Sequence, residues 1–449
     1  MKSPSTALVG SLLVVTVMSC GGGSSAPAPL TFPSIALQPA SQTMYSGGTA
    51  NFTIAVTGNP APTFVWQRSD DSGRTWNTIS GANSATYNFT VQPADTGAQF
   101  RALATNSQGN VLSTAATLRE VPAVYAGGRI DVTNPDAGYW LNGTFVHLAS
   151  PTGTTAEVTA LTVSGNKVIA AANWLSAGQQ IPTGYWLDGN WIDLALPSGS
   201  TWGLVRSLAV SGNDLYLSGT LVPGGSAGYW LNGGWNGLPV PPGSDFGDVF
   251  SLAVSGADVY AAGYSGTSSG SAAPGYWVNG TWTALPVPPG AANGIVFSIV
   301  VSASDVYAAG FANQTTGWVG NPGYWLNGNW VGLALPSGQT EGAVISLVVS
   351  GTDVYAAGYT ENANARIPGY WVNGTWVGLT VPFGLDGGAV LSLVLSGGKV
   401  YAGGYSSGED SIGTFRSVPG YWVDGQWIAL PIPAPGTGSS EVTSIVVIP

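Results

Sequence analysis

Cysteine and histidine are nearly missing from the 449 residues: each occurs once, as Cys20 and His147. A single cysteine excludes a disulfide within the chain. A metal site needs clustered His, Cys or carboxylate ligands, and a nucleophilic serine needs a basic partner such as histidine. Two Gly-x-Ser-x-Gly matches, 224–228 and 404–408, lie in Gly/Ser-rich segments and lack a strand–turn–helix context. The sequence therefore predicts no catalytic residues, no metal and no cofactor.

Charged side chains are also scarce. They make up 7% of the chain, and the formal net charge is −11 without any acidic or basic run. After residue 121 the only lysines are Lys167 and Lys399. Nucleic-acid binding needs clustered Lys and Arg, so we expect no nucleic-acid partner. The arginines of this region are scattered singly along the sequence: Arg129, Arg206, Arg366 and Arg416.

The mostly apolar run from Ala7 to Val17 is too short to span a bilayer, which takes about 20 residues as a helix. It is followed by Ser19-Cys20, and Val17-Met18-Ser19-Cys20 resembles the lipobox of bacterial lipoproteins, with a less usual Met. The resemblance implies a signal peptide over 1–19, a lipidated Cys20 and a lipid anchor in the bacterial cell envelope, at the outer membrane or cell surface. An ordinary cleaved signal peptide is the alternative. Residues 20–32 then hold the lipidated cysteine and a flexible tether.

Glycine, proline and large aromatic residues are abundant. The chain has 66 Gly, 30 Pro, 18 Trp and 18 Tyr, and 44% of its residues are apolar. Such a chain can bury a core, so the Gly and Pro are best explained as punctuation between many turns. The composition predicts an all-β protein.

Residues 33–120 alternate apolar and polar residues in short runs between turn signals, which is typical of a β-sandwich. Trp66, followed by Asp95, Gly97 and Phe100, resembles the core Trp and tyrosine corner of immunoglobulin-like domains. The resemblance implies an immunoglobulin-like sandwich with Ile54 and Ala102 in place of the cystine. The run 69–76, SDDSGRTW, resembles the Asp-box of sialidases. It occurs once, so we interpret it as a structural turn.

Residues 121–449 are built from a repeat. Gly-Tyr-Trp recurs seven times, at spacings of 44 to 51 residues. One unit divides into four short strands: Phe250–Val254, Val259–Tyr264, Gly275–Val278 and Thr281–Pro286. Four strands per unit of this length is typical of a β-propeller. Residues 122–148 supply only three strands, and Val442–Val447 supplies the missing one. We therefore predict a seven-bladed β-propeller over 121–449, closed by the C-terminal strand.

The tryptophans of the repeat are predicted to be structural. Asn279-Gly280 favours a type I′ turn, which places Trp277 directly opposite Trp282. The same offset joins the other pairs: Trp186 with Trp191, Trp230 with Trp235, Trp325 with Trp330, Trp371 with Trp376 and Trp422 with Trp427. The first unit has Trp140 opposite Phe145.

The units also resemble kelch repeats, and some of them have the kelch double glycine, as at Gly403-Gly404. Several units carry Ala-Gly in its place. The resemblance implies a propeller fold and no particular activity. Repeated carboxylates between the first two strands are interpreted as turn-stabilising residues, with a ring of bound ions as the alternative: Asp214, Asp258, Asp305 and Asp353.

Three tryptophans stand outside the repeat: Trp174, Trp202 and Trp318. Exposed indoles commonly bind sugars, so these residues are our candidates for ligand binding. The balance favours a non-catalytic, lipid-anchored binding or adhesion protein that recognises a glycan or a protein through the propeller. The alternatives are an extracellular polysaccharide hydrolase or lyase, which would need paired carboxylates in an axial site, and a structural envelope protein.

Overall fold

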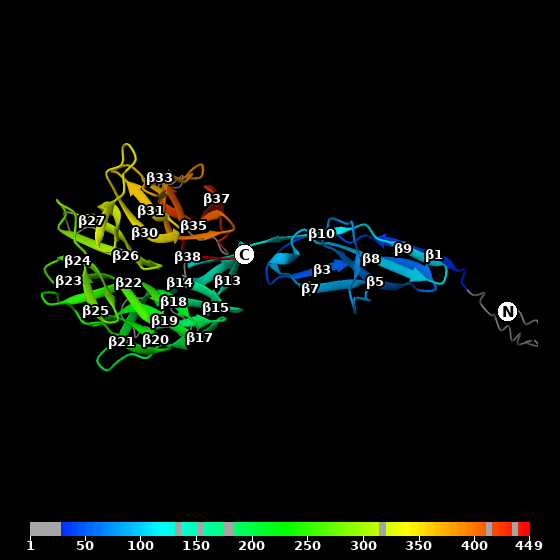
Figure 1. Ribbon diagram of the computed structural model, residues 1–449, viewed down its shortest axis with the longest axis horizontal. Coiled ribbons are helices and arrows are strands. Elements are labelled where there is room, and N and C mark those ends of the chain that lie inside the picture. Colours follow the sequence, from blue (N-terminus) through cyan, green and yellow to red (C-terminus); the bar gives the residue numbers. More distant parts are fainter. Residues whose placement is uncertain are drawn as a thin grey trace, which may run out of the picture. The chain divides into compact units, whose positions relative to one another are not determined.

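The computed structural model describes residues 28–130, 136–150, 156–174, 183–313, 320–409, 415–432 and 439–449. The chain divides into two compact units, Met1–Glu120 and Val121–Pro449. Figure 1 shows both, with strands throughout. The only helix among the described residues is one 3₁₀ turn, so the protein is all-β as predicted.

The first unit is a β-sandwich of short strands. Its elements are β1 (Thr31–Leu37), β2 (Gln42–Tyr45), β3 (Thr49–Thr53), β4 (Ala55–Asn59), β5 (Thr63–Ser69), β6 (Asn77–Thr78), β7 (Thr86–Thr90), the 3₁₀ turn η1 (Pro93–Asp95), β8 (Gln99–Asn106), β9 (Gly109–Leu112) and β10 (Ala116–Val121). One sheet has the order β2-β10-β8-β5-β6, and β9 pairs with β8. The others are the pairs β1-β4 and β3-β7.

The core of this sandwich forms around Trp66 on β5, which is fully buried. Phe52 on β3 stacks on Phe100 of β8, with 4.6 Å between the ring centroids. The two positions implied to replace a cystine, Ile54 and Ala102, are both buried in the same cluster. Apolar packing between the two layers therefore takes the place of a covalent bond.

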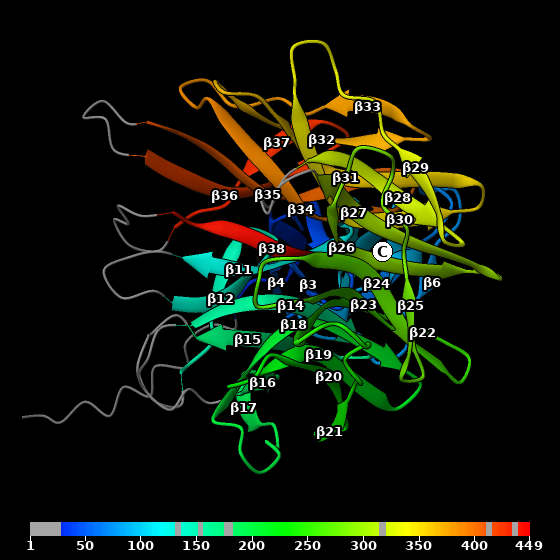
Figure 2. The same ribbon diagram turned by 90° about the vertical axis from the view of Figure 1, so that its left-hand side faces the viewer.

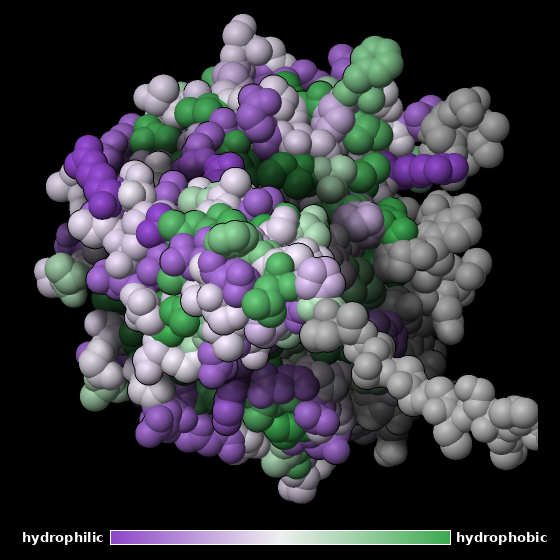
Figure 3. Space-filling model, turned by 90° about the vertical axis from the view of Figure 1, so that its right-hand side faces the viewer, coloured by the Kyte–Doolittle hydropathy of each residue, from purple (hydrophilic) through white to green (hydrophobic). Residues whose placement is uncertain are grey.

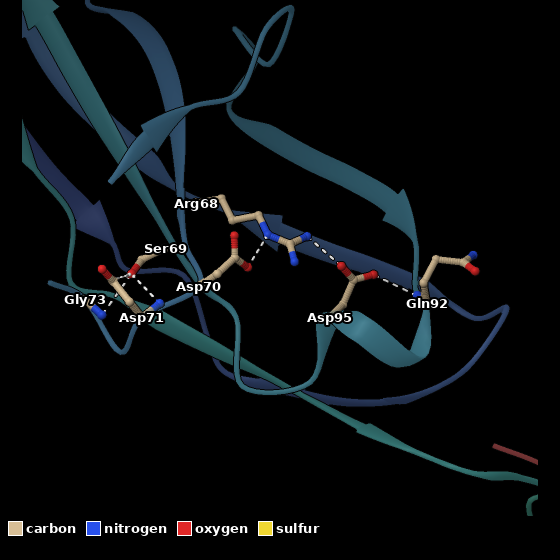
Figure 4. A network of polar contacts seen from close by, with 7 residues as sticks. All are labelled: Arg68, Ser69, Asp70, Asp71, Gly73, Gln92 and Asp95. Atoms are coloured by element: carbon tan, nitrogen blue, oxygen red, sulfur yellow. Dashed lines mark hydrogen bonds and ion pairs between the residues drawn. The ribbon is translucent and has the colours of Figure 1, made fainter. Parts of the chain in front are cut away.

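A polar network fixes two turns of the sandwich (Figure 4). Arg68 Nη1 lies 2.6 Å from Asp95 Oδ1, and the other carboxylate oxygen of Asp95 accepts a 2.7 Å bond from the backbone N–H of Gln92. In the Asp-box-like turn, Asp71 accepts hydrogen bonds from the hydroxyl and N–H of Thr75 at 2.6 and 2.8 Å. Bonds from Thr75 and Ser69 lower the pKa of Asp71 to about 2. The motif serves as a turn between β5 and β6.

The second unit contains seven four-stranded antiparallel sheets. Sheet 1 contains β38 (Glu441–Ile448), β11 (Ala123–Ile130), β12 (Asp136–Leu141) and β13 (Thr144–His147), and sheet 2 contains β14 (Ala156–Ser164), β15 (Lys167–Trp174), β16 (Gly184–Leu187) and β17 (Asn190–Asp193). Sheet 3 contains β18 (Trp202–Ser211), β19 (Asp214–Val222), β20 (Ser226–Leu231) and β21 (Gly234–Gly237), and sheet 4 contains β22 (Phe246–Ser255), β23 (Asp258–Gly266), β24 (Ala272–Val278) and β25 (Thr281–Ala284). Sheet 5 contains β26 (Asn293–Ser302), β27 (Asp305–Asn313), β28 (Asn321–Leu326) and β29 (Asn329–Gly332), sheet 6 contains β30 (Glu341–Ser350), β31 (Asp353–Glu361), β32 (Arg366–Val372) and β33 (Thr375–Gly378), and sheet 7 contains β34 (Gly387–Ser396), β35 (Lys399–Glu409), β36 (Phe415–Val423) and β37 (Gln426–Ala429).

The last strand of the chain completes the first sheet. Figure 2 shows β38 in red beside β11 in cyan, and the two strands pair from Ala123 with Ile448 to Arg129 with Glu441. This pairing supplies the fourth strand that residues 122–148 lack.

In each of the seven sheets an Asn-Gly or Asp-Gly pair turns the chain between the third and fourth strands. Asn279 and Gly280 both have positive φ, 49° and 86°, as a type I′ turn requires. Trp277 therefore lies opposite Trp282, and their ring centroids are 4.4 Å apart. The other predicted pairs are also opposite each other, with centroids 4.4 to 5.1 Å apart.

The inner tryptophan of each pair joins its sheet to the preceding one. Trp325 is fully buried, and its Nε1 donates a 2.7 Å bond to the carbonyl of Pro286 in the linker after sheet 4. Every other sheet makes the equivalent bond. In sheet 1 the donor is Trp140, and the acceptor is Pro431, which follows sheet 7.

A second set of bonds links the first strands of neighbouring sheets. The hydroxyl of Ser346 on β30 accepts a 3.1 Å bond from the N–H of Leu393 on β34. Equivalent bonds join Ser251 to Ile299, Ser298 to Leu347, Ser392 to Ile445 and Ser444 to Leu161. The small serine at this position therefore lets the first strands lie close together.

The repeated aspartates stabilise a turn, although it is not the turn between the first two strands for which the sequence predicted them: each holds the asparagine of the turn between the third and fourth strands. Asn279 Nδ2 donates to Asp258 Oδ1 at 2.7 Å, while Asn279 Oδ1 accepts from the N–H of Val259. Asp214, Asp305 and Asp353 hold the equivalent turn asparagines. Where the turn residue is itself an aspartate, as at Asp424, a lysine takes the other position, and Lys399 Nζ lies 3.9 Å from Asp424 Oδ2.

Candidate functional site

The seven sheets differ most at one end of their first two strands. At this end of the second strand, one position follows a glycine in six sheets and follows Ala172 in sheet 2. The residue there is Arg129, Asn173, Thr220, Tyr264, Phe311, Tyr359 or Tyr405, in chain order. Their cross-strand partners on the first strands are Glu441, Glu157, Leu204, Asp248, Ile295, Ala343 and Ala389. Sheets 4 to 7 carry aromatic rings at this position, and sheets 1 to 3 carry polar or charged groups.

The aromatic cluster comprises Phe250, Tyr264, Phe297, Phe311, Tyr359 and Tyr405. Phe250 on β22 packs against Phe297 on β26 at 5.2 Å between centroids, and Phe297 contacts Phe311 at 5.8 Å. Phe250 and Phe297 are the residues that β-bulges leave without a cross-strand partner. The bulges direct these rings toward the neighbouring sheet, so the cluster is continuous from sheet 4 to sheet 7.

The ionic cluster comprises Arg129, Glu157, Arg206, Asp248 and Glu441. Arg206 Nη2 lies 3.0 Å from Asp248 Oδ2, and Thr220 donates its hydroxyl hydrogen to the other oxygen of Asp248. Arg129 Nη1 lies 3.9 Å from Glu157 Oε2. Arg206 also stacks over the ring of Phe250 at 4.9 Å, which joins the ionic cluster to the aromatic cluster.

Two carboxylates of the ionic cluster are hard to ionise. Burial raises the pKa of Glu157, and the nearby charge of Glu441 raises it further. Burial also raises the pKa of Glu441, against the opposing effect of Arg129. Neighbouring carboxylates with raised pKa values occur in acid–base catalysts as well as in structural networks.

A hollow of about 550 Å³ opens between sheets 6 and 7 at the same strand ends. We call it the charged hollow, because its lining includes Glu361, Arg366, Asp386 and Glu409. Its volume is in the range typical of small-molecule sites. Tyr405 and Phe415 line it too, and the side chain of Phe415 is 59% exposed.

Arg366 is held in place from three sides. Its Nε lies 2.7 Å from Glu361 Oε2, its Nη1 donates to the hydroxyl of Tyr405 at 3.3 Å, and its guanidinium lies 4.1 Å from the ring centroid of Tyr359. Burial alone would lower the pKa of Arg366, but Tyr359 and the bond to Glu361 raise it. Burial raises the pKa of Tyr359 to about 12. A guanidinium fixed in this way presents its free donors at a defined angle.

The loop beside the hollow is also pre-shaped. The side-chain oxygen of Asn362 accepts bonds from the N–H groups of Asn364 and Ala365 at 2.8 and 3.0 Å, and its Nδ2 donates to Gly338 at 2.7 Å. Three carboxylates and one guanidinium line the hollow. This balance favours neutral or cationic ligands that carry several hydrogen-bond donors, and disfavours anions.

The structure describes only some of the residues that the sequence predicts to be functional. Cys20 and Trp318 lie outside the described residues. Trp174 ends β15 opposite Ala156, and its side chain lies outside the described part. Trp202 is half-buried and begins β18, opposite Val222. Trp202 therefore lies at the varied strand ends, at the register position that Phe246 occupies in sheet 4.

The arginines that look scattered in the sequence come together in the fold. Arg129 and Arg206 belong to one cluster, and Arg366 lies at the same strand ends in the charged hollow. Glu157, Asp248, Glu361 and Glu441 were not singled out from the sequence. Their signal was available, because all of them stand where one repeat departs from the others.

The Gly-x-Ser-x-Gly matches do not form a nucleophile site. Ser406 is buried within β35, and Ser226 begins β20, so neither lies on a strand-to-helix turn. Among the described residues, no group of three His, Cys, Asp or Glu could hold a metal ion. In that same part of the chain, no helix has the length and apolar character of a membrane span.

Comparison with known proteins finds relatives of the first unit. A family described as a domain of unknown function, DUF8696, matches residues 36–121. Endoglucanase C of Cellulomonas fimi is 36% identical over 105 residues, which is 23% of this chain and 9% of that enzyme. This chain therefore matches only a small part of the enzyme.

Two solved structures are similar to part of this chain. The tandem Ig repeats of Dlar are 23% identical, cover 21% of this chain and 50% of theirs, and give a TM-score of 0.18. A chimeric titin Z1Z2 is 24% identical, covers 21% of this chain and 97% of its own, and gives a TM-score of 0.17. The paired sheets around Trp66, described above, make the first unit an immunoglobulin-like β-sandwich.

Proposed function

We propose that the protein is a lipid-anchored, non-catalytic glycan-binding protein of the bacterial cell envelope, displayed at the outer membrane or cell surface. Val17-Met18-Ser19-Cys20 supports the anchor, with Cys20 as the lipidated residue. Residues 20–32 would act as a tether, and the immunoglobulin-like unit as a spacer. On the face of the molecule that Figure 3 shows, hydrophobic residues are scattered among hydrophilic ones.

We further propose that the seven sheets are the blades of one closed, kelch-like β-propeller. The bonds from Trp140 to Pro431 and from Ile445 to Ser392 support closure, because they connect sheet 1 to sheet 7 in the way that other neighbours are connected. Contacts of β38 with both β14 and β34 support it as well. In such a ring the varied strand ends would surround the axis at one face.

The charged hollow is the observation that carries the binding function. A glycan offers hydroxyl groups that donate to carboxylates and accept from a guanidinium, and it offers C–H faces that pack on aromatic rings. Asp386 and Arg366 supply the first kind of contact, and Phe415 supplies the second. The name of the endoglucanase relative, which refers to cleavage of a glucan, is consistent with a carbohydrate ligand.

The test is a glycan-array screen of the full chain in detergent, followed by titration of each hit. Phe415→Ala should weaken binding of the hit roughly tenfold, since it removes a rim aromatic. Phe383→Ala is the matched control, because Phe383 is fully exposed and does not line the hollow. Equal effects of the two variants would remove the charged hollow as the binding site. Silence across the array would remove the glycan proposal and leave a protein ligand or a structural envelope role.

Glu157 and Glu441 support a second candidate, a polysaccharide hydrolase or lyase. Paired carboxylates are the groups that such chemistry uses, and this pair has raised pKa values. The discriminating measurement is product release, assayed as new reducing ends or unsaturated ends during incubation with a bound glycan. Release that Glu441→Gln abolishes would establish the enzyme, and stable binding without release would establish the binding protein.

A further inference from the structure

A second, smaller hollow lies between sheets 4 and 5, with a volume of about 180 Å³. We call it the apolar hollow. Its walls include Phe246, Ile295 and Phe311, and the amides of Asn293 and Asn313 also line it. None of its lining residues is charged.

The two hollows occupy equivalent places in the repeat. Each is lined by the loop between the second and third strands of one sheet, and by the first two strands of the next sheet. In the apolar hollow those elements contribute Ser271 and Ile295, and in the charged hollow they contribute Ala365 and Gly387. The hollows are two sheets apart along the repeat, and the aromatic cluster connects them: Tyr264 and Phe311 line one, and Tyr405 lines the other.

The chemistry of the apolar hollow restricts what it can hold. Its volume is below that of a site for a whole small ligand, so it fits one substituent. A charged substituent would be buried without a counter-charge, at high cost. A hydroxyl group alone would leave the partly exposed ring of Phe246 uncovered. The substituent that suits these walls is small, uncharged and partly apolar, with a donor and an acceptor for amide groups.

We propose that the apolar hollow binds the acetamido group of an N-acetylated sugar. The methyl group would pack on Phe246, Ile295 and Phe311, and the amide would meet Asn293 or Asn313. This inference rests on the proposed glycan-binding function and names the ligand class more closely: a glycan with N-acetylhexosamine units, long enough to reach both hollows. The sugar units of such a glycan are uncharged or carry an amino group, and both kinds suit the charged hollow, which three carboxylates line.

The experiment compares two matched ligands by calorimetric titration of the full chain in detergent. One is a hexamer of β-1,4-linked N-acetylglucosamine, and the other is a hexamer of β-1,4-linked glucose, which carries a hydroxyl group in place of each acetamido group. We expect the acetylated hexamer to bind at least about tenfold more tightly, by the contacts that one buried substituent adds.

Variants assign the preference to a hollow. Ser271→Trp fills the apolar hollow, and Phe246→Ala removes one wall. Each should reduce the preference for the acetylated hexamer to near unity while leaving binding of the glucose hexamer unchanged. Ser269→Trp places the same indole on the same loop outside the lining and should leave the preference intact. Phe415→Ala, in the charged hollow, should weaken both ligands together.

The failures are distinguishable. Equal affinity for the two hexamers, or a preference that survives both Ser271→Trp and Phe246→Ala in folded protein, would overturn the acetamido assignment and leave glycan binding standing. Binding of neither hexamer, together with silence across the array, would overturn the proposed function and this assignment with it. Thermal unfolding of each variant confirms that it is folded.

Discussion

The outer strands of the seven sheets are nearly alike, whereas the ends of their first two strands differ from sheet to sheet. Each third strand carries a buried indole bonded to the preceding linker, as Trp325 is bonded to Pro286. At the varied end of the second strands, the equivalent position is occupied by residues as different as Arg129, Asn173 and Tyr359. The repeated positions account for how the sheets hold together. The varied positions line the hollows and form the two clusters, so departures from the repeat mark the candidate site.

The largest expected effect tests whether the repeated positions carry stability. Trp325→Ala should lower the free energy of unfolding by about 3–5 kcal/mol, since it removes a fully buried indole and a hydrogen bond. Trp330, its half-buried cross-strand partner, is the matched control, and Trp330→Ala should cost clearly less. Urea denaturation measures both, and equal losses would mean that the pair, rather than the buried ring, carries the stability.

The second prediction concerns close packing between the first and second strands. A Cβ added at Gly358 would lie 2.0 Å from the carbonyl oxygen of Ala343, so the backbone would have to move. Gly358→Ala should destabilise the protein by about 1–3 kcal/mol or more. Gly234→Ala is the control, because a Cβ there meets only ordinary contacts at 3.5 Å. The control should be neutral or slightly stabilising in the same denaturation experiment.

A smaller effect is expected for the bonds between neighbouring first strands. Ser346→Ala removes the acceptor of the Leu393 N–H and should cost about 1 kcal/mol. Ser350→Ala, at an exposed position of the same strand, should cost nothing measurable. If the two variants unfold at the same urea concentration, these hydroxyls add nothing to the association of the sheets.

The smallest effect is expected at one of the varied positions, Glu441. Because the pKa of Glu441 is raised in the folded protein, folding favours its protonated form, and its ionised form opposes folding at neutral pH. Glu441→Gln should therefore raise the melting temperature at pH 7.5. The gain should shrink as the pH falls toward and below the ordinary glutamate pKa of about 4.3, where Glu441 is protonated in both the folded and the unfolded protein. Scanning calorimetry across pH measures it.

Glu409→Gln, at an exposed carboxylate, is the control and should leave the melting temperature unchanged at every pH. A Glu441→Gln variant that is less stable at pH 7.5 would show that the bond network with Arg129 outweighs the cost of burial. The varied position would then be structural in the same sense as the repeated ones.

Much of the fold could be predicted from short stretches of sequence. The Asn279-Gly280 turn fixes the register that opposes Trp277 to Trp282, and both lie within six residues. The four-strand division of each repeat follows from equally local turn signals, whereas Asp258 holds Asn279 across 21 residues. The pairing of β38 with β11 joins the first and last strands of the second unit. It could be predicted because one repeat lacked a strand and the last strand belonged to no complete repeat.

The candidate site could not be predicted in the same way. Arg206 and Asp248 are 42 residues apart and on different sheets, and Arg366 meets Tyr405 across 39 residues. No motif at either residue indicates the other. The tryptophans outside the repeat were a partial guide: Trp202 does lie at the varied strand ends, but the hollows are built mainly from residues that sequence reasoning left aside.

The sequence by itself determined the all-β class, the repeated four-strand unit and its structural tryptophans, because turn chemistry and alternation act over a few residues. Only the tertiary structure decided which charges meet and which rings form a continuous cluster. Those contacts depend on β-bulges that redirect Arg206, Phe250 and Phe297, and on which strand ends become neighbours. Both are set by the packing of whole sheets, which no single repeat encodes.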